Sequence, residues 1–314
     1  MLLPLFLVLA GLVGLLWSAD RFVGAAAATA FRAGVSTLLV GMTVVALGTS
    51  APEIVVSIMA AVDGTPDIAV GNALGSNIAN IALVLGITAL AVPVPVPFSM
   101  VRRELPLLLG ATGLAGYTLA NGHLDRIDGL LLVLLLAFSL WWLVRADSPE
   151  SESSDAIPGM PLGQALVWLV TTLAIMMASS RALVWGASEL ARGFGVSELV
   201  IGLTVVAIGT SLPELAACLA SALKRQHGLV IGNVIGSNLF NMLAVLPIPA
   251  LLAPGASDPA AAGRDYPVML ALTLVLGALL LWQRRGRIGR LAGGAFATSY
   301  LLYLGWLALS GTAP

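Results

Sequence analysis

Ten apolar segments follow one another along the chain, separated by short polar breaks. Because about 20 apolar residues are needed to cross a bilayer as a helix, the pattern predicts an all-α membrane protein with ten transmembrane helices. The approximate segments are 2–19 (continuing toward 33), 37–61, 68–92, 104–120, 128–144, 162–191, 198–223, 228–253, 266–283 and 290–310.

Two polar clusters inside these segments occur twice, and 161 residues separate the copies. GMTVVALGTSAPE at 41–53 and GNALGSNIAN at 71–80 return as GLTVVAIGTSLPE at 202–214 and GNVIGSNLFN at 232–241. A long fixed period indicates a duplicated unit. With five segments in each half, the second copy enters the membrane from the opposite side, which predicts inverted repeats. We expect a first repeat at 1–144, an acidic cytoplasmic linker at 145–161 and a second repeat at 162–314.

Composition agrees with a membrane location. Only 10% of the residues are charged, against roughly 25% in soluble domains, and the mean hydropathy is +0.99. The N-terminal segment has no basic region or clear cleavage site, so we interpret it as the first membrane helix. The net charge of −1 does not indicate a nucleic-acid partner. The single cysteine, Cys218, excludes an internal disulfide and is assigned no role.

Lysine and arginine counting predicts the orientation in the membrane. With the N-terminus outside, ten of these residues fall in inner loops and three in outer loops. We therefore expect both termini to be external, in a bacterial cytoplasmic (inner) membrane.

Two carboxyl groups carry the functional prediction. Of sixteen acidic residues, only Glu53 and Glu214 lie well inside a predicted span. A charge at mid-bilayer costs about 2.5–3.5 kcal/mol even on insertion scales, so such residues usually serve an ion or proton pathway. No lysine or arginine occupies a matching depth in the sequence, and a bound cation could neutralise the pair.

The neighbours of these glutamates carry oxygen atoms. Thr49 shares a helix face with Glu53, and Pro52 removes a backbone N–H and so frees carbonyl oxygens near Gly48. Carboxylate, hydroxyl and carbonyl oxygens suit Ca²⁺ and Na⁺. The further donors predicted from the two copies are Ser50, Ser76, Asn80, Thr210, Ser211, Ser237 and Asn241.

GTSAPE with GSNIAN, and GTSLPE with GSNLFN, resemble the α1 and α2 repeats of the cation/Ca²⁺ antiporter superfamily, specifically its sodium/calcium exchanger branch. The resemblance covers nearly the whole chain. In length and organisation the chain is similar to the compact prokaryotic, inner-membrane members of this branch. It implies exchange of Na⁺ for Ca²⁺ by alternating access, with the segments 2–33 and 162–193 sliding over the other helices.

The resemblance also implies a set of ion ligands. The implied Ca²⁺ site consists of Glu53, Glu214 and the carbonyl groups of Thr49 and Thr210. The implied flanking Na⁺ sites use Ser50, Ser76, Ser211, Ser237 and the carbonyls of Ala46 and Ala207, with Asn80 and Asn241 at the centre. No cofactor is expected, and the oligomeric state is left open. Position 241 is Asn where some relatives have Asp, which favours K⁺-independent exchange.

Three alternatives remain. Apolar burial disfavours a charged carboxyl group, so Glu53 and Glu214 could exchange protons instead of Na⁺, as in a Ca²⁺/H⁺ antiporter. The same ligands could line a passive channel. An intramembrane enzyme is disfavoured because no nucleophile, His or Cys stands next to either glutamate in the sequence.

Overall fold

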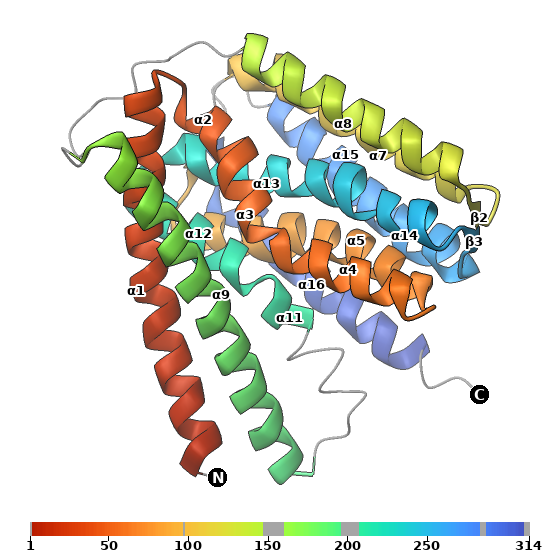
Figure 1. The fold of residues 1–314 in the computed structure, drawn as a ribbon, viewed down its shortest axis with the longest axis horizontal. Coiled ribbons are helices and arrows are strands. Elements are labelled where there is room, and N and C mark those ends of the chain that lie inside the picture. Colours follow the sequence, from red (N-terminus) through yellow and green to blue (C-terminus); the bar gives the residue numbers. More distant parts are fainter. Residues whose placement is uncertain (1, 97, 147–159, 196–206, 283–286, 311–314) are drawn as a thin grey trace.

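The chain folds into a bundle of helices that includes two long, tilted ones (Figure 1). The computed structural model describes residues 2–96, 98–146, 160–195, 207–282 and 287–310. The central linker at 147–159 and the start of the second repeated cluster, up to 206, lie outside the described residues. The expectations placed on those residues therefore stay predictions.

The first half is almost entirely helical, and its helices are interrupted inside the repeated clusters. Its elements are α1 (Leu2–Ala33), α2 (Thr37–Val40), the π-helix η1 (Gly41–Val45), α3 (Ala46–Thr49), α4 (Ala51–Val62), α5 (Pro66–Ala79), the π-helix η2 (Asn80–Leu85), α6 (Gly86–Ala91), β1 (Val94–Pro95), α7 (Phe98–Leu119), β2 (His123–Leu124) and α8 (Arg126–Ala146). Helix α1 continues to Ala33, as the sequence predicts.

The second half has the same succession of elements. Its described elements are α9 (Leu162–Gly193), α11 (Ala207–Thr210), α12 (Leu212–Leu223), α13 (His227–Phe240), η4 (Asn241–Val245), α14 (Pro247–Leu252), β3 (Gly255–Ala256), η5 (Ala261–Asp265), α15 (Tyr266–Trp282), β4 (Arg287–Ile288) and α16 (Arg290–Ser310).

The sequence repeat is also a structural repeat. Adding 161 to the bounds of α3, α4, α5, α6 and β1 gives the bounds of α11, α12, α13, α14 and β3. The π-helices η2 and η4 begin at the equivalent residues Asn80 and Asn241. The same local sequence therefore produces the same breaks in both halves.

Two of the continuous helical segments lie at the centre of the bundle. In the most apolar stretch of Pro66–Ala91, 83% of the residues are buried, and in that of His227–Leu252, 94%. The other five candidate spans bury only 22 to 33%. Their apolar side chains face outward, as expected for helices in contact with lipid.

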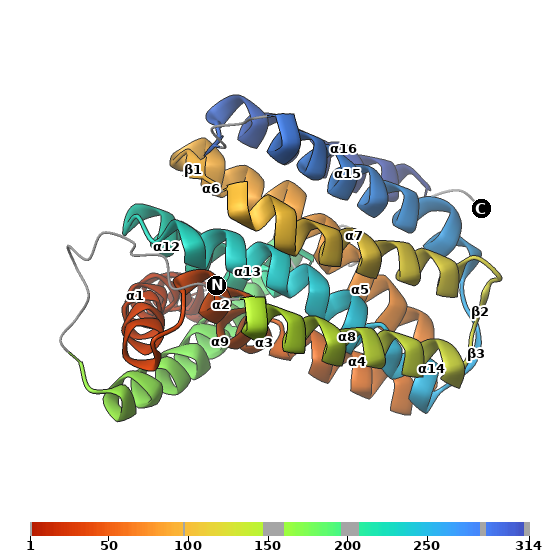
Figure 2. The ribbon, with the colours of Figure 1, turned by 90° about the horizontal axis from the view of Figure 1, so that it is seen from above.

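Helices α1 and α9 form a separate layer. They pack along each other and run steeply across the remaining helices (Figures 1 and 2). Gly11 of α1 approaches Ser179 and Leu183, and Gly186 of α9 approaches Pro4 and Val8, so closely that a Cβ atom would fall 2.6–3.1 Å from their atoms. Small residues at such positions allow the backbones to come close together.

Among the described residues, seven helices are long and apolar enough to cross a membrane, or eight if the bent pair Thr37–Thr49 and Ala51–Val62 forms one span. The chain is thus a multi-pass helical membrane protein. Two of the ten expected spans are not among these eight candidates. The segment at 198–223 is only partly described, and the segment at 104–120 lies in α7.

Two short β-ladders connect the halves. Strand β1 pairs with β4, and β2 pairs with β3, both antiparallel. Each ladder therefore joins a strand of the first half to a strand of the second.

Candidate functional site

Both repeated TS-x-PE clusters fold as a helix break followed by a new helix. Ser50 (φ −85°, ψ 5°) separates α3 from α4, and Ser211 (φ −91°, ψ 3°) separates α11 from α12. Proline in the first turn of the second helix lacks the N–H that would bond the residue four positions earlier. The two helical pieces around Ser50 meet at a bend of 44°.

This break places each glutamate in the first turn of a helix. Glu53 and Glu214 are each 2% exposed. The partial positive charge of a helix N-terminus stabilises a negative carboxylate. This position therefore offsets part of the cost of burying a carboxylate in an apolar interior.

The two carboxyl groups belong to one site. Glu214 lies close enough to Glu53 and to the Thr49 hydroxyl for electrostatic interaction with both. The Ser76 hydroxyl donates to Glu53 Oε1 over 3.5 Å. Helix α12 packs against η2, which begins at Asn80, and α4 packs against η4, which begins at Asn241. Each glutamate helix therefore contacts the π-helix of the other half.

Buried polar atoms without a hydrogen-bond partner gather around these carboxyl groups. Buried polar atoms are normally paired, so unpaired ones require an explanation. Within the described part of the chain, the unpaired atoms of the site are Ser50 Oγ, Glu53 Oε2, Ser211 Oγ, Glu214 Oε2, Ser237 Oγ, Asn241 Oδ1 and Asn241 Nδ2. All but one are oxygen atoms.

These atoms are of the type that binds hard cations. Ca²⁺ takes six to eight oxygen ligands and tolerates irregular geometry. Among the residues that the structure describes, no three His, Cys, Asp or Glu side chains group in a way that could hold a metal ion. A cation here would be bound by two carboxylates and neutral oxygens.

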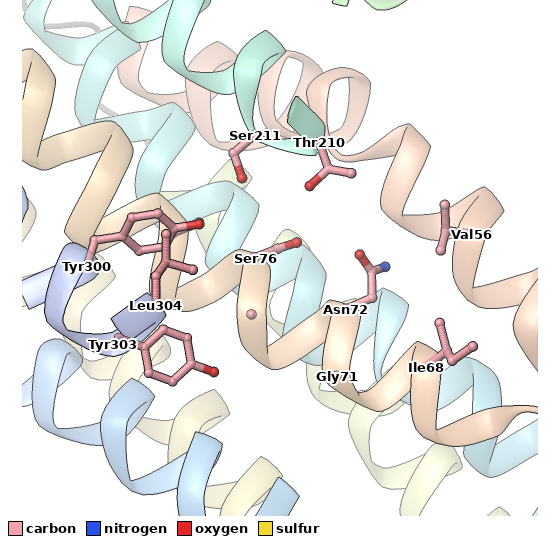
Figure 3. Close-up of a pocket in the computed structure, with 12 residues that line it drawn as sticks. Val56, Ile68, Gly71, Asn72, Ser76, Thr210, Ser211, Tyr300, Tyr303 and Leu304 are labelled. Carbon is pink, nitrogen blue, oxygen red and sulfur yellow. The ribbon is translucent and has the colours of Figure 1, made fainter. Parts of the chain in front are cut away.

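A pocket of about 350 Å³ leads to one side of this cluster. Ser76 of α5 and Ser211, with the adjacent Thr210, line one part of it, and Tyr300 and Tyr303 of α16 line another (Figure 3). The pocket borders the oxygen-rich cluster at Ser76 and Ser211, and neither glutamate lines it.

The repeated glycine pairs can be compared only in part. Among the described residues, a Cβ atom on Gly71 or Gly75 would meet nothing within 4 Å, and both glycines line the pocket. At the equivalent Gly236, a Cβ atom would lie 2.5 Å from the Met42 carbonyl oxygen, and Gly232 is packed equally tightly. The atoms that pack against Gly232 and Gly236 belong to residues 38–46, whose equivalents, 199–206 and the side chain of Ala207, lie outside the described part of the chain.

The structure shows how deeply each predicted site residue is buried. Thr49, Ser50, Ser76, Asn80, Ser211, Ser237 and Asn241 are all buried, as is Ala46, while Thr210 is half-buried. The Ala46 carbonyl oxygen accepts hydrogen bonds from the Ser50 N–H at 2.9 Å and from the Thr49 hydroxyl at 3.4 Å, so its second lone pair is available only when Thr49 directs its hydrogen elsewhere. Ala207 begins α11, and its side chain lies outside the description. The ligand roles themselves stay predictions.

Sequence reasoning missed two asparagines beside the glutamates. The Asn72 amide donates to the Glu53 carbonyl oxygen (3.0 Å) and to Ser57 Oγ (3.1 Å). Its equivalent Asn233 accepts from the Thr49 hydroxyl at 3.1 Å. Both belong to the repeated GN pair, so their recurrence at the same spacing was the available signal.

A multi-pass helical bundle with two carboxyl groups buried among hydroxyl groups belongs to the class of ion-transport proteins. The chain is a member of the sodium/calcium exchanger protein family, whose sequence model matches it twice, over residues 3–145 and 164–309. This is a family of antiporters rather than of enzymes.

Individual relatives agree with this assignment over nearly the full length. The chain is 50% identical to "Putative antiporter CaxA" of Alkalimonas amylolytica, over 93% of each sequence. It is 42% identical to inner membrane protein YrbG of Escherichia coli, over 98% of this chain and 97% of that one. A solved structure of the sodium-calcium exchanger NCX_Mj superposes with a TM-score of 0.84 at 33% identity, covering 97% of this chain and 98% of that chain.

The resemblance of the two motif pairs to this family is thus confirmed. The chain is a prokaryotic sodium/calcium exchanger-type antiporter, and Na⁺ and Ca²⁺ are the ions that its family transports.

Proposed function

We propose that Glu53 and Glu214 form one shared site at which Na⁺ and Ca²⁺ compete, and that the protein exchanges these ions by alternating access. Ca²⁺ is bound between the two carboxylates, whose combined charge it balances. The hydroxyl and amide groups of the four repeated clusters, at 41–53, 71–80, 202–214 and 232–241, complete the ligand set and form the Na⁺ sites.

One observation carries this proposal: the unpaired oxygen atoms around the two buried carboxyl groups. A buried acceptor without a partner is costly, and a buried carboxylate more so. Cation binding supplies partners to Ser50, Ser211 and Ser237 and neutralises both glutamates at once. The site is then stable when loaded and unfavourable when empty, as exchange without leak requires.

The duplicated architecture supports alternating access. In a protein built from two equivalent halves, exchanging the conformations of the halves would open the opposite side of a site between them. The five spans predicted in each half and the reciprocal β-ladders favour inverted repeats.

The balance of charge supports K⁺-independent exchange. Asn241 contributes no charge, so the site holds two carboxylates and one Ca²⁺ neutralises it. A further monovalent cation beside Ca²⁺ would leave a net positive charge in a poorly polarisable interior, which is unfavourable.

The proposal is tested by Ca²⁺ uptake into proteoliposomes loaded with Na⁺, with liposomes loaded with K⁺ or choline as controls. We expect uptake above equilibrium that needs internal Na⁺ and is absent in Glu53→Gln and in Glu214→Gln. Uptake that is unchanged in both variants would overturn the assignment of the site.

The same assay separates the alternatives. A Ca²⁺/H⁺ antiporter would respond to a pH gradient and ignore internal Na⁺. A channel would equilibrate Ca²⁺ but never accumulate it against its gradient. Na⁺-driven accumulation that persists when the pH gradient is abolished excludes both.

A further inference from the structure

Three hydrogen bonds lead from Thr49, next to the two glutamates, into the second half of the protein. The Thr49 hydroxyl donates to Asn233 Oδ1 (3.1 Å), and Asn233 Nδ2 donates to Cys218 Sγ (3.3 Å). The Cys218 thiol in turn donates to the Val230 carbonyl oxygen (3.7 Å). Thr49 and Cys218 are fully buried and Asn233 is 1% exposed, so water does not compete for these bonds.

The chain of bonds has one direction. A thiol has one hydrogen, and Val230 accepts it, so the Cys218 sulfur is left as an acceptor. The sulfur therefore selects the Nδ2 side of the Asn233 amide. The other side, Oδ1, must then face Thr49. The orientation of the amide is set by the protein interior and not by the ion.

The direction matters because the Thr49 hydroxyl has one hydrogen and three possible acceptors. Besides Asn233 Oδ1, these are the Ala46 carbonyl oxygen at 3.4 Å and Glu214, whose carboxyl group also lies within reach of this hydroxyl. When the hydrogen points to Asn233, the lone pairs of Thr49 Oγ1 and both oxygens of Glu214 remain available. When it points to Glu214, it occupies a carboxylate oxygen that a cation needs.

We propose that Asn233 is a positioning residue that takes the Thr49 hydrogen while a cation occupies Glu214, and that Cys218 holds Asn233 in the orientation this requires. This inference rests on the proposed function of the glutamate pair. Neither residue touches the ion, and both act through Thr49.

The first half contains a related arrangement in a wetter setting. Asn72, the equivalent of Asn233, donates to the Glu53 carbonyl oxygen and to Ser57, the equivalent of Cys218. Asn72 also lines the pocket and is only half-buried, whereas Asn233 is 1% exposed. In the second half, water therefore does not compete for the threonine hydrogen.

The test is Ca²⁺ binding by the full-length protein in detergent, measured by titration calorimetry and by the Ca²⁺-induced rise in melting temperature. Asn233→Leu keeps the size of the side chain and removes both hydrogen bonds. We expect its Ca²⁺ dissociation constant to rise about tenfold, the effect of losing one hydrogen bond to a charged site.

Two variants of Cys218 test whether Ca²⁺ binding depends on an acceptor at this position. Cys218→Ser keeps an acceptor for Asn233 Nδ2, as Ser57 does for Asn72, and should bind Ca²⁺ like the wild type. Cys218→Ala removes the acceptor and should weaken binding in the same direction as Asn233→Leu, by a smaller factor. This pair also tests the proposal if Asn233→Leu fails to fold.

Two controls separate positioning from a general loss of packing. Asn238→Leu removes another buried asparagine of the same helix, and its Ca²⁺ affinity should remain that of the wild type even if its melting temperature falls. Thr49→Val should weaken binding in the wild type but add little in the Asn233→Leu background. Additive effects of the two substitutions would mean that Asn233 does not act through Thr49.

The result also distinguishes this inference from the proposed function. If the wild type binds Ca²⁺ and Glu53→Gln does not, but Asn233→Leu and Cys218→Ala bind normally, only the positioning role is wrong. If Glu53→Gln binds Ca²⁺ as tightly as the wild type, the assignment of the shared site is wrong, and the positioning role, which depends on it, is wrong as well.

Discussion

At the scale of single residues, the charge of the site follows from its side chains. Glu53 and Glu214 supply two negative charges, and Asn241 supplies an uncharged amide next to them. A site with two carboxylates and one Ca²⁺ has no net charge. The step in which Ca²⁺ crosses the membrane should therefore not respond to the membrane potential, whatever the number of Na⁺ ions exchanged.

Asn241→Asp tests this charge count. A third carboxylate gives the Ca²⁺-loaded site a net negative charge, so moving it across a potential of 100 mV involves about 2.3 kcal/mol. We expect Ca²⁺/Ca²⁺ exchange in proteoliposomes to be insensitive to an imposed potential in the wild type and sensitive in Asn241→Asp. Potential-dependent Ca²⁺/Ca²⁺ exchange in the wild type would contradict the neutral loaded site.

At the scale of helices, glycine allows the central helix α13 to pack directly against the first half. Gly236 of α13 lies against the backbone of η1, and Gly232 lies against Leu38, Gly41 and Met42. A side chain at either position would separate these segments. The close packing of α13 on η1 therefore depends on the two glycines.

Alanine substitutions at Gly236 and at Gly113 of α7 should have opposite effects on stability. Gly→Ala in a helix interior normally stabilises by about 1 kcal/mol, and Gly113 is exposed, with nothing among the described residues within 4 Å of a Cβ atom. In Gly236→Ala, the methyl group would lie 2.5 Å from the Met42 carbonyl oxygen, and overpacking of this kind costs about 1–3 kcal/mol.

We therefore expect thermal unfolding in detergent, followed by circular dichroism, to shift downward for Gly236→Ala and to stay constant or rise for Gly113→Ala. Equal shifts for the two variants would contradict the tight packing of Gly236.

At the scale of the whole molecule, the two halves hold each other through reciprocal contacts. The ladders β1–β4 and β2–β3 each join the halves, and each glutamate helix packs on the π-helix of the other half. The site is complete only when both halves are assembled. Its orientation in the membrane then follows from the distribution of lysine and arginine, which predicts that both termini are external.

Thiol labelling tests this orientation. With Cys218→Ser as a cysteine-free background, Asp63→Cys places a thiol in the loop between α4 and α5, and Pro161→Cys places one just before α9. In intact cells, we expect a membrane-impermeant maleimide to label Asp63→Cys directly and Pro161→Cys only after permeabilisation. The reverse pattern would invert the predicted topology.

Much of this protein could be predicted from sequence because the decisive features are local. Apolar length gives membrane spans, the prolines at 52 and 213 give helix breaks, and a carboxylate in an apolar span is costly enough to mark a functional site. The fixed period of 161 residues relates the two clusters. The family assignment follows from these motifs and is confirmed by the comparisons.

Tertiary structure decided what depends on packing between distant segments. It placed Glu53 near Glu214 and packed Gly232 and Gly236 against residues 38–46 of the other half. It also connected Thr49 to Asn233 across 184 positions of sequence. These contacts join segments that are far apart in the chain, so no local pattern of residues could have shown them.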